Sequence, residues 1–214
     1  MIEILYDCPH FTVAVKPAGF LSEEGEGSFP DLLKKQLSLP RLHPVHRLDR
    51  VVSGVMVYAK TPQAAAELSK ERALEKTYLT VVKGVGLPPK GELSDLLFKD
   101  SKKNKTFVVS AKRKGVREAT LSYRVLEENL DKPLSFVFVT LQTGRSHQIR
   151  AQFSHRKHPV LGDGKYGGSD NAVKNIALFS HELAFTLFGK PYRFRALPQS
   201  EYPWNLFPLQ KLEG

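Results

Sequence analysis

Residues 46–54 read HRLDRVVSG and run directly into the apolar segment 54–59, GVMVYA. The apolar segment is typical of a buried strand, and four of the five residues 46–50 are ionisable. Charged groups at the entrance to a core must be paired, or their pKa values shift until they are neutral. Asp49 therefore has two interpretations. It is a member of a structural ion-pair cluster, or a carboxylate that nearby arginines hold ionised as a nucleophile or base.

Residues 141–150, LQTGRSHQIR, form a second candidate motif. A strand ends here, Gly144 turns the chain, and a helix is predicted over 146–155 with Ile149 and Phe153 on its inner face. Backbone N–H groups at a helix start attract anions, and the Arg145 guanidinium adds a planar fork for a carboxylate or phosphate. The alternative is an ordinary strand–turn–helix with surface arginines.

Three further segments carry polar residues that chemistry could use. Tyr78 in residues 75–78, EKTY, is either a packing residue of a strand, or a phenol that acts on a proton or stacks on a base. Asp163 in residues 162–168, GDGKYGG, most simply bonds its own tight loop. Residues 16–19, KPAG, predict a structural turn after a strand.

The apolar runs and turn residues predict an α+β domain around a mostly antiparallel sheet, with flanking helices and loops. The predicted strands are 2–6, 11–15, 54–59, 77–82, 119–126, 134–141, 176–186 and 191–196. The predicted helices are 30–37, 62–72 and 146–155, the second with Thr61 as its N-cap. No repeat, low-complexity tract or long linker divides the chain, so residues 1–214 are expected to form a single domain.

The charge of the chain favours a polyanionic partner. Thirty-two Lys and Arg oppose 22 Asp and Glu, which gives a net charge of +10. Eight of the basic residues lie in the segment 99–117, where only Asp100 opposes them. Residues 106–110 within it are strand-like, so the segment is predicted to be a basic hairpin.

Several classes of protein and site are not expected. The single cysteine, Cys8, excludes a disulfide framework and a cysteine-cluster metal site. His147, His155 and His158 are close in sequence but have no cysteine or carboxylate at ligand spacing, so no metal is expected. No glycine-rich phosphate loop, membrane span or signal peptide is recognisable, so we expect a cytoplasmic protein without a nucleotide cofactor or membrane.

Taken together, the motifs resemble the pseudouridine synthases, and within them the RluA-type family. The resemblance is carried, in order and spacing, by KPAG at 16–19, HRLD at 46–49, KTY at 76–78, TGRSHQIR at 143–150 and GD at 162–163. These motifs span nearly the whole chain. The combination of HRLD with TGRSHQIR is highly specific for this family. The resemblance implies the pseudouridine-synthase catalytic fold.

The resemblance also implies a reaction and a set of roles. Asp49 would be the nucleophile, Arg145 would pair with it, and Tyr78 would pack on the target base and act on a proton. The N1–C1′ bond of a uridine is broken, the base is turned over, and it is rejoined through C5, with no cofactor and no metal. One convincing carboxylate is compatible with this isomerisation, whereas ordinary glycoside hydrolysis uses two.

RNA is the implied partner, either tRNA or large-subunit rRNA, and the chain is expected to act as a monomer. Arg47 would help to hold the RNA open around a flipped uridine. The residues expected to contact RNA or the base are His46, Arg47, Leu48, Lys76, His147, Gln148, Ile149, Arg150, Lys102, Lys103 and Lys105.

The chain departs from the family pattern at four positions: Val15, Val52, Gln152 and Phe179. None of them removes a group with an implied catalytic role, but they leave the choice of RNA open. The catalytic region begins at once, so an amino-terminal S4-type RNA-binding domain is not expected. Two other functions stay open: an RNA-binding protein of this fold without activity, and a nucleoside or base-excision hydrolase that uses Asp49 with Asp163.

Overall fold

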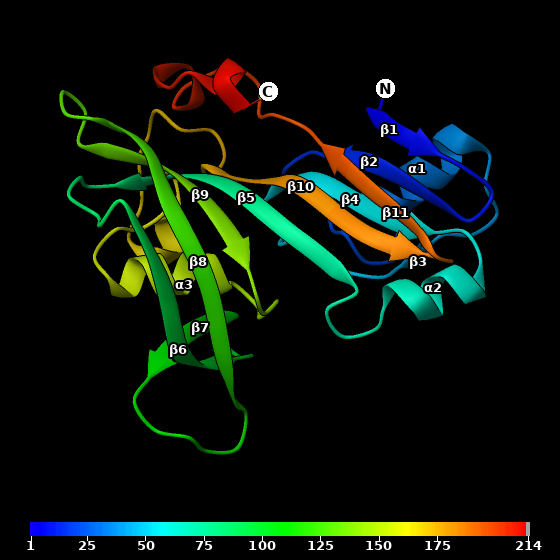
Figure 1. The fold of residues 1–214 in the computed structure, drawn as a ribbon, viewed down its shortest axis with the longest axis horizontal. Coiled ribbons are helices and arrows are strands. Elements are labelled where there is room, and N and C mark those ends of the chain that lie inside the picture. The colour runs from blue at the N-terminus through cyan, green and yellow to red at the C-terminus, as the bar shows by residue number, and fades with distance from the viewer. Residues whose placement is uncertain (213–214) are drawn as a thin grey trace. The chain divides into compact units, whose positions relative to one another are not determined.

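The computed structural model describes residues 1–212, and these form eleven strands and three α-helices (Figure 1). The strand pairings are mostly antiparallel, with β4 and β10 paired in parallel, which confirms the predicted α+β class. The strands are β1 (Ile4–Asp7), β2 (Phe11–Lys16), β3 (His43–Pro44), β4 (Ser53–Ala59), β5 (Leu74–Lys83), β6 (Lys90–Asp100), β7 (Lys105–Val109), β8 (Val116–Asn129), β9 (Leu134–Leu141), β10 (Leu178–Leu187) and β11 (Lys190–Arg195). The helices are α1 (Phe29–Leu37), α2 (Pro62–Leu68) and α3 (Gln148–His155), with short 3-10 helices at Gly164–Tyr166, Trp204–Leu206 and Leu209–Leu212.

The residues group into two compact units. Unit 1 comprises Met1–Lys76 and Phe179–Pro198, and unit 2 comprises Thr77–Leu178 and the segment that begins at Gln199. The chain passes from one unit to the other inside β5, again at the beginning of β10, and a third time between Pro198 and Gln199.

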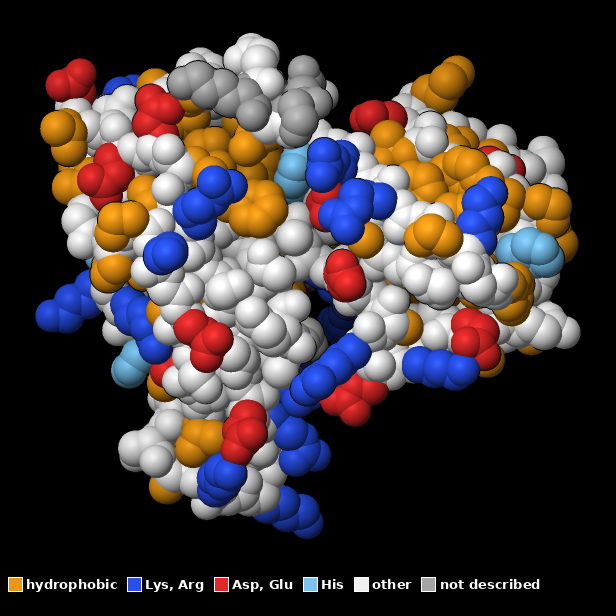
Figure 2. Space-filling model, viewed as in Figure 1, with side chains coloured by type: hydrophobic (Ala, Val, Ile, Leu, Met, Phe, Trp, Pro, Cys, Tyr) orange, Lys and Arg blue, Asp and Glu red, His pale blue; other side chains and the backbone are white. Residues whose placement is uncertain are grey.

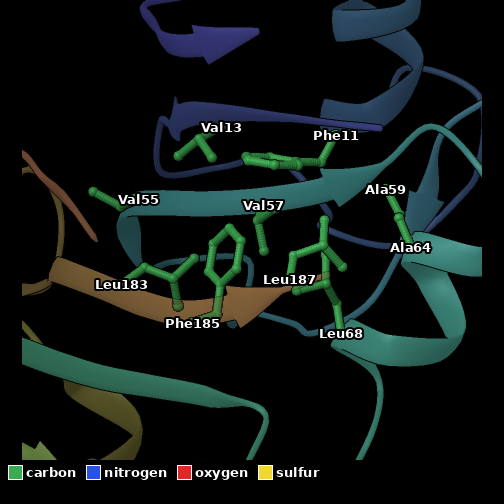
Figure 3. Close-up of a cluster of buried hydrophobic side chains, with 10 residues drawn as sticks. All are labelled: Phe11, Val13, Val55, Val57, Ala59, Ala64, Leu68, Leu183, Phe185 and Leu187. Atoms are coloured by element: carbon green, nitrogen blue, oxygen red, sulfur yellow. The ribbon is translucent and has the colours of Figure 1, made fainter. Parts of the chain in front are cut away.

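Unit 1 is built on the strand order β1-β2-β4-β10, with β11 beside β10 and β3 beside β4. Its core gathers side chains from β2, β4, β10 and α2 (Figure 3). The cluster consists of Phe11, Val13, Val55, Val57, Ala59, Ala64, Leu68, Leu183, Phe185 and Leu187. Because β4 is buried along its length, the segment before it is anchored at the edge of this core.

Helix α2 begins as the sequence predicts and ends earlier. The Thr61 side chain accepts a hydrogen bond from the Ala64 N–H, and Pro62 occupies the first turn. The helix ends at Leu68 rather than near Arg72, whose backbone is left-handed at φ 61°. Leu68 is the last residue of the helix that the core buries, so the polar residues beyond it gain nothing from continuing the helix.

Unit 2 contains the antiparallel order β9-β8-β6-β7, and α3 packs against β6 and β7. The sequence reading missed β6, whose lysines, acidic residues and Gly91 give it a low strand propensity. Nine residue pairs with β8 and the buried Leu93 and Leu97 stabilise it instead. Tertiary pairing therefore overrides local propensity here.

The basic segment 99–117 divides into two parts. Strands β6 and β7 pair from Leu96–Val109 to Asp100–Lys105, so the hairpin turn is 101–104. Residues 110–115 form the connection to β8, which begins at Val116 rather than at the predicted 119. Of the eight basic residues, the hairpin turn thus carries Lys102 and Lys103 and the longer loop carries Lys112, Arg113 and Lys114. The other three lie in strands: Lys99 in β6, Lys105 in β7 and Arg117 in β8.

Candidate functional site

Asp49 lies half-buried on the loop between β3 and β4, in unit 1. Leu48 and Val52 on either side of it are 5% and 2% exposed, and the Val52 N–H donates to the Asp49 carbonyl at 3.0 Å. The Ser22 hydroxyl donates to the Leu48 carbonyl at 2.8 Å and accepts from the Leu48 N–H at 3.2 Å. Buried neighbours on both sides therefore fix the backbone that presents the carboxylate.

The KPAG segment contacts this loop directly, which explains the turn predicted there. The Gly19 N–H donates to the Arg50 carbonyl at 2.7 Å, and the Arg50 Nε donates to the Gly19 carbonyl at 2.8 Å. Arg47 is exposed and pairs with Glu23 at 2.9 Å. Residues 19–23 thus hold both arginines that flank Asp49.

Lys16, which the sequence predicted only as part of a structural turn, interacts electrostatically with Asp49. Its side chain is fully buried at the end of β2, where Nζ donates to the carbonyls of Pro17 and Phe20, each at 2.9 Å. Burial lowers the pKa of Lys16 from its usual 10.5 to about 8, and the negative charge of Asp49 opposes this shift. The sequence signal that could have indicated a buried lysine is the position of Lys16 directly after the apolar residues 11–15.

His46 makes a structural contact within unit 1. Its Nε2 accepts a hydrogen bond from the Val57 N–H of β4 at 3.1 Å. Burial, helped by the charge of Lys76, holds the pKa of His46 well below its usual value, so the ring is neutral. Burial also lowers the pKa of Lys76. Contact of His46 and Lys76 with the target base stays a prediction.

In unit 2, Gln148 fixes the segment that carries Arg145. The Gln148 side-chain oxygen accepts from the Arg145 N–H at 3.0 Å and from the Thr143 hydroxyl at 2.8 Å, and its amide donates to the Thr120 carbonyl at 3.1 Å. Arg145 is exposed, and its Nε donates to the Glu118 carbonyl at 3.0 Å. The turn before α3 is therefore hydrogen-bonded to β8, and the Arg145 side chain in this turn is exposed to solvent.

Helix α3 begins at Gln148, two residues later than predicted. His147 precedes it in the left-handed region at φ 51°, which ends any helical path from Ser146. Gln148, Ile149 and Arg150 are 3%, 4% and 5% exposed. Arg150 forms a two-pronged ion pair with the buried Asp163, at 2.6 and 2.9 Å. These three side chains support the motif from within the protein, and their contact with RNA stays a prediction.

Tyr78 lies on β5 in unit 2 and is 6% exposed. Lys102 and Lys103 are exposed at the hairpin turn. The ammonium group of Lys105 lies 5.6 Å from the Phe107 ring centroid and 5.0 Å from that of Tyr166. The three predicted lysines therefore differ. Lys102 and Lys103 are exposed and can bind a phosphate, whereas the Lys105 ammonium group lies over two aromatic rings.

A basic groove of about 510 Å³ joins Arg145 to the loop before β8. Its lining is Leu96, Lys112, Arg113, Val116, Arg117, Glu118 and Arg145. Lys112 pairs with Glu118 at 2.6 Å, and the Arg113 guanidinium stacks 4.8 Å from the Phe98 ring centroid. Figure 2 shows Lys and Arg side chains gathered at this end of unit 2. Lys112, Arg113 and Arg117 belong to the predicted basic segment, and Arg145 is a predicted catalytic residue, but the sequence did not predict that these cations line one groove.

Three of the four departures from the family pattern, at Val52, Gln152 and Phe179, have local explanations in packing. The Gln152 amide donates to the Leu93 carbonyl, the Asp95 carboxylate and the Ala119 carbonyl, which ties α3 to β6 and β8. Val52 and Phe179 are buried apolar residues, and Phe179 pairs in parallel with Ser53 at the beginning of β4. These three side chains support the fold around the motifs.

Among residues 1–212, no three His, Cys, Asp or Glu side chains lie close enough together to hold a metal ion. Among the same residues, no helix has the length and apolar character needed to cross a membrane.

Comparisons with known proteins agree on a family. The sequence model of the RNA pseudouridylate synthase family matches residues 10–155. An uncharacterized RNA pseudouridine synthase of Bacillus subtilis is 30% identical over 193 residues, which cover 85% of this chain and 63% of that protein. The ribosomal large subunit pseudouridine synthase D of Xylella fastidiosa is 36% identical over 180 residues, which cover 78% of this chain and 52% of that protein.

The fold is likewise that of a solved relative. The structure of human RNA pseudouridylate synthase domain containing 1 superimposes with a TM-score of 0.84 at 21% identity, covering 100% of this chain and 93% of that one. The chain belongs to the RNA pseudouridylate synthase family, as its motifs predicted. It spans between about half and two thirds of the length of the curated relatives named above.

Proposed function

We propose that this chain is an RNA pseudouridine synthase that isomerises a specific uridine in tRNA or large-subunit rRNA, with Asp49 as the nucleophile. The observation that carries the proposal is the Asp49 loop. Buried residues anchor it on both sides, while Asp49 itself is only half-buried. A nucleophile needs such a fixed and accessible position, because small displacements of a reacting group are costly. The name of the Xylella relative favours large-subunit rRNA between the two substrates.

The other roles follow the family motifs. Arg145 and Tyr78 complete the proposed catalytic set, and Arg47 helps to hold the RNA open around an extruded base. The groove beside Arg145 and the lysines of the hairpin turn supply cations for the phosphate backbone. The proposed reaction needs no cofactor and no metal, so chelation by EDTA is expected to leave the rate unchanged. We further propose a cytoplasmic monomer.

The alternative function, a nucleoside or base-excision hydrolase, would require Asp163 to act as a second catalytic carboxylate. Both carboxylate oxygens of Asp163 are bonded to the Arg150 guanidinium, and the side chain is 2% exposed. A second carboxylate that acts on water must be reachable, so this geometry disfavours Asp163 in that role. A hydrolase would release free uracil, whereas an isomerase leaves the mass of the RNA unchanged.

The test is carbodiimide mapping of pseudouridine in total tRNA and rRNA from cells with and without the gene. We expect one missing site, restored by the wild type and by Asp131→Asn, an exposed-turn control, and not by Asp49→Asn. Asp49→Asn is nearly isosteric and should fold normally. Full restoration by Asp49→Asn would overturn the nucleophile assignment. No missing site, together with no product on unmodified transcripts in vitro, would favour a binding protein without activity.

A further inference from the structure

The hydroxyl of Tyr166 joins two segments that are far apart in sequence. Tyr166 is 5% exposed at the end of the 3-10 helix Gly164–Tyr166. Its oxygen accepts a hydrogen bond from the Thr106 N–H of β7 at 2.7 Å and lies 2.9 Å from Nδ1 of His147. Burial raises the pKa of Tyr166, so the hydroxyl keeps its proton. That proton is then available to His147.

Two more hydrogen bonds connect the hairpin to the segment before α3 and to the 3-10 helix that carries Tyr166. The Thr106 hydroxyl donates to the Ser146 carbonyl at 2.8 Å, and the Lys165 ammonium donates to the Asn104 carbonyl at 3.0 Å. The end of the hairpin turn that carries Lys102 and Lys103 is therefore bonded to residues 146–147 and 165–166. Arg145 is the residue immediately before the bonded segment.

Side chains of α3 fix the position of Tyr166. The Ser154 hydroxyl donates to the Tyr166 carbonyl at 2.7 Å, and the Arg150 guanidinium lies 5.0 Å from the centre of the ring. Because Arg150 is bonded to Asp163, the ring rests on an ion pair that cannot easily move. The hydroxyl is thus a fixed point to which the segments on either side attach.

His147 needs such a fixed point. Its backbone is left-handed at φ 51°, a conformation that is unfavourable for a non-glycine residue and persists only where contacts enforce it. The Tyr166 hydroxyl is one contact of that kind, and the bond from Thr106 to Ser146 is another.

We propose that Tyr166 is a positioning residue that holds Arg145 in its working place and couples it to the hairpin that carries Lys102 and Lys103. The inference rests on the proposed function, because it concerns a residue of the proposed reaction. It assigns to Tyr166 an effect on the rate of the chemical step that acts through Arg145.

The experiment compares Tyr166→Phe with Tyr123→Phe, a matched loss of a hydroxyl in the same unit. Tyr123 is 7% exposed on β8, opposite Gly91 and so at the far end of β6 from the hairpin turn. Three quantities are measured: the single-turnover rate at saturating RNA, the dissociation constant of the RNA, and amide hydrogen exchange of residues 142–148. For Tyr166→Phe we expect a rate roughly 10- to 100-fold lower, unchanged RNA affinity and faster exchange. Tyr123→Phe should match the wild type in all three.

A second background separates positioning from general support of the fold. With Arg145→Lys already present, Tyr166→Phe should cause little further loss of rate, because the residue it positions has gone. A full further loss would overturn the proposal, as would wild-type exchange at 142–148 in Tyr166→Phe. If Tyr166→Phe does not fold, Thr106→Val breaks the bond to Ser146 alone and must show the same loss of rate with unchanged affinity. An inactive wild type would refute the proposed function, while the exchange measurement would still decide the positioning role.

Discussion

At position 54 the backbone leaves no room for a side chain. A Cβ on Gly54 would lie 2.3 Å from the Ser180 carbonyl oxygen of the parallel strand β10, and the residue has φ +122°. Gly54 follows Asp49 by five positions, so this close approach of β4 and β10 comes shortly after the proposed nucleophile in the chain. The requirement is steric and conformational at once.

We therefore expect Gly54→Ala to lower the free energy of unfolding by about 3 kcal/mol or more. Gly86→Ala is the control, since Gly86 also has a positive φ, +84°, but no atom within 4 Å of its Cβ position. The control should lose only about 1–2 kcal/mol. Urea unfolding of both variants checks this, and equal losses would contradict the steric explanation.

Lys16 predicts a particular dependence of stability on pH. Its pKa is about 8 in the folded chain, against 10.5 in the unfolded one. Between these values the unfolded chain holds a proton that the folded chain has released, so stability rises with pH there. Below about pH 8 both states are protonated, and the full cost of the buried charge is present.

The check is the difference in unfolding free energy between the wild type and Lys16→Met, in which all other titrations cancel. Relative to the variant, the wild type should gain up to about 3 kcal/mol between pH 8 and pH 10.5. The difference should not change between about pH 6 and about pH 8. A flat difference across the higher range would mean that Lys16 stays protonated in the folded protein.

At the scale of elements, the buried pair Arg150–Asp163 joins α3 to the 3-10 helix behind it. Removing one charge of such a pair leaves the other buried without compensation. Asp163→Asn should therefore cost about 3 kcal/mol of stability. Glu67→Gln, which breaks the exposed pair of Glu67 with Lys70 on α2, should cost less than about 1 kcal/mol. Thermal or urea unfolding compares them, and similar small losses would show that the buried pair contributes little.

The basic groove and the hairpin turn make separate predictions for RNA affinity. Arg113→Gln with Arg117→Gln removes two cations of the groove, and Lys102→Gln with Lys103→Gln removes two of the turn. For each lost phosphate contact, the slope of log K against log salt concentration should fall by about 0.7–0.9. Lys35→Gln with Lys70→Gln, both exposed in unit 1, is the control and should leave the slope unchanged. If the slope is unchanged in either double variant, the corresponding element makes no phosphate contact and its cations face solvent.

At the scale of the whole molecule, the path of the chain predicts cooperative unfolding. The chain passes between the two units inside β5, at the beginning of β10 and between Pro198 and Gln199, so neither unit is a continuous segment. Disrupting β5 or β10 in one unit disturbs the strand that continues into the other. We expect one transition, with Trp204 fluorescence from unit 2 coinciding with far-ultraviolet circular dichroism from both units. Two separate transitions would contradict the single-domain prediction.

The elements that the sequence predicted well are those with a strong local pattern. Strand β4 is a continuous apolar run, and α2 begins with a threonine cap and a proline. Strand β6 was missed because its pattern is polar, and its pairing with β8 is what forms it. The beginning of α3 was misplaced because a left-handed histidine has no signature in sequence.

The sequence by itself determined the family, the α+β class and Asp49 as the proposed nucleophile, because motif spacing and hydrophobic period are properties of residues close together in the chain. Only the tertiary structure placed the Lys16 charge near Asp49 and the Tyr166 hydroxyl between Thr106 and His147. Thr106 and Tyr166 are 60 positions apart, and Lys16 lies 33 before Asp49. Such contacts depend on which distant segments become neighbours when the core is buried, and no local preference along the chain encodes that choice.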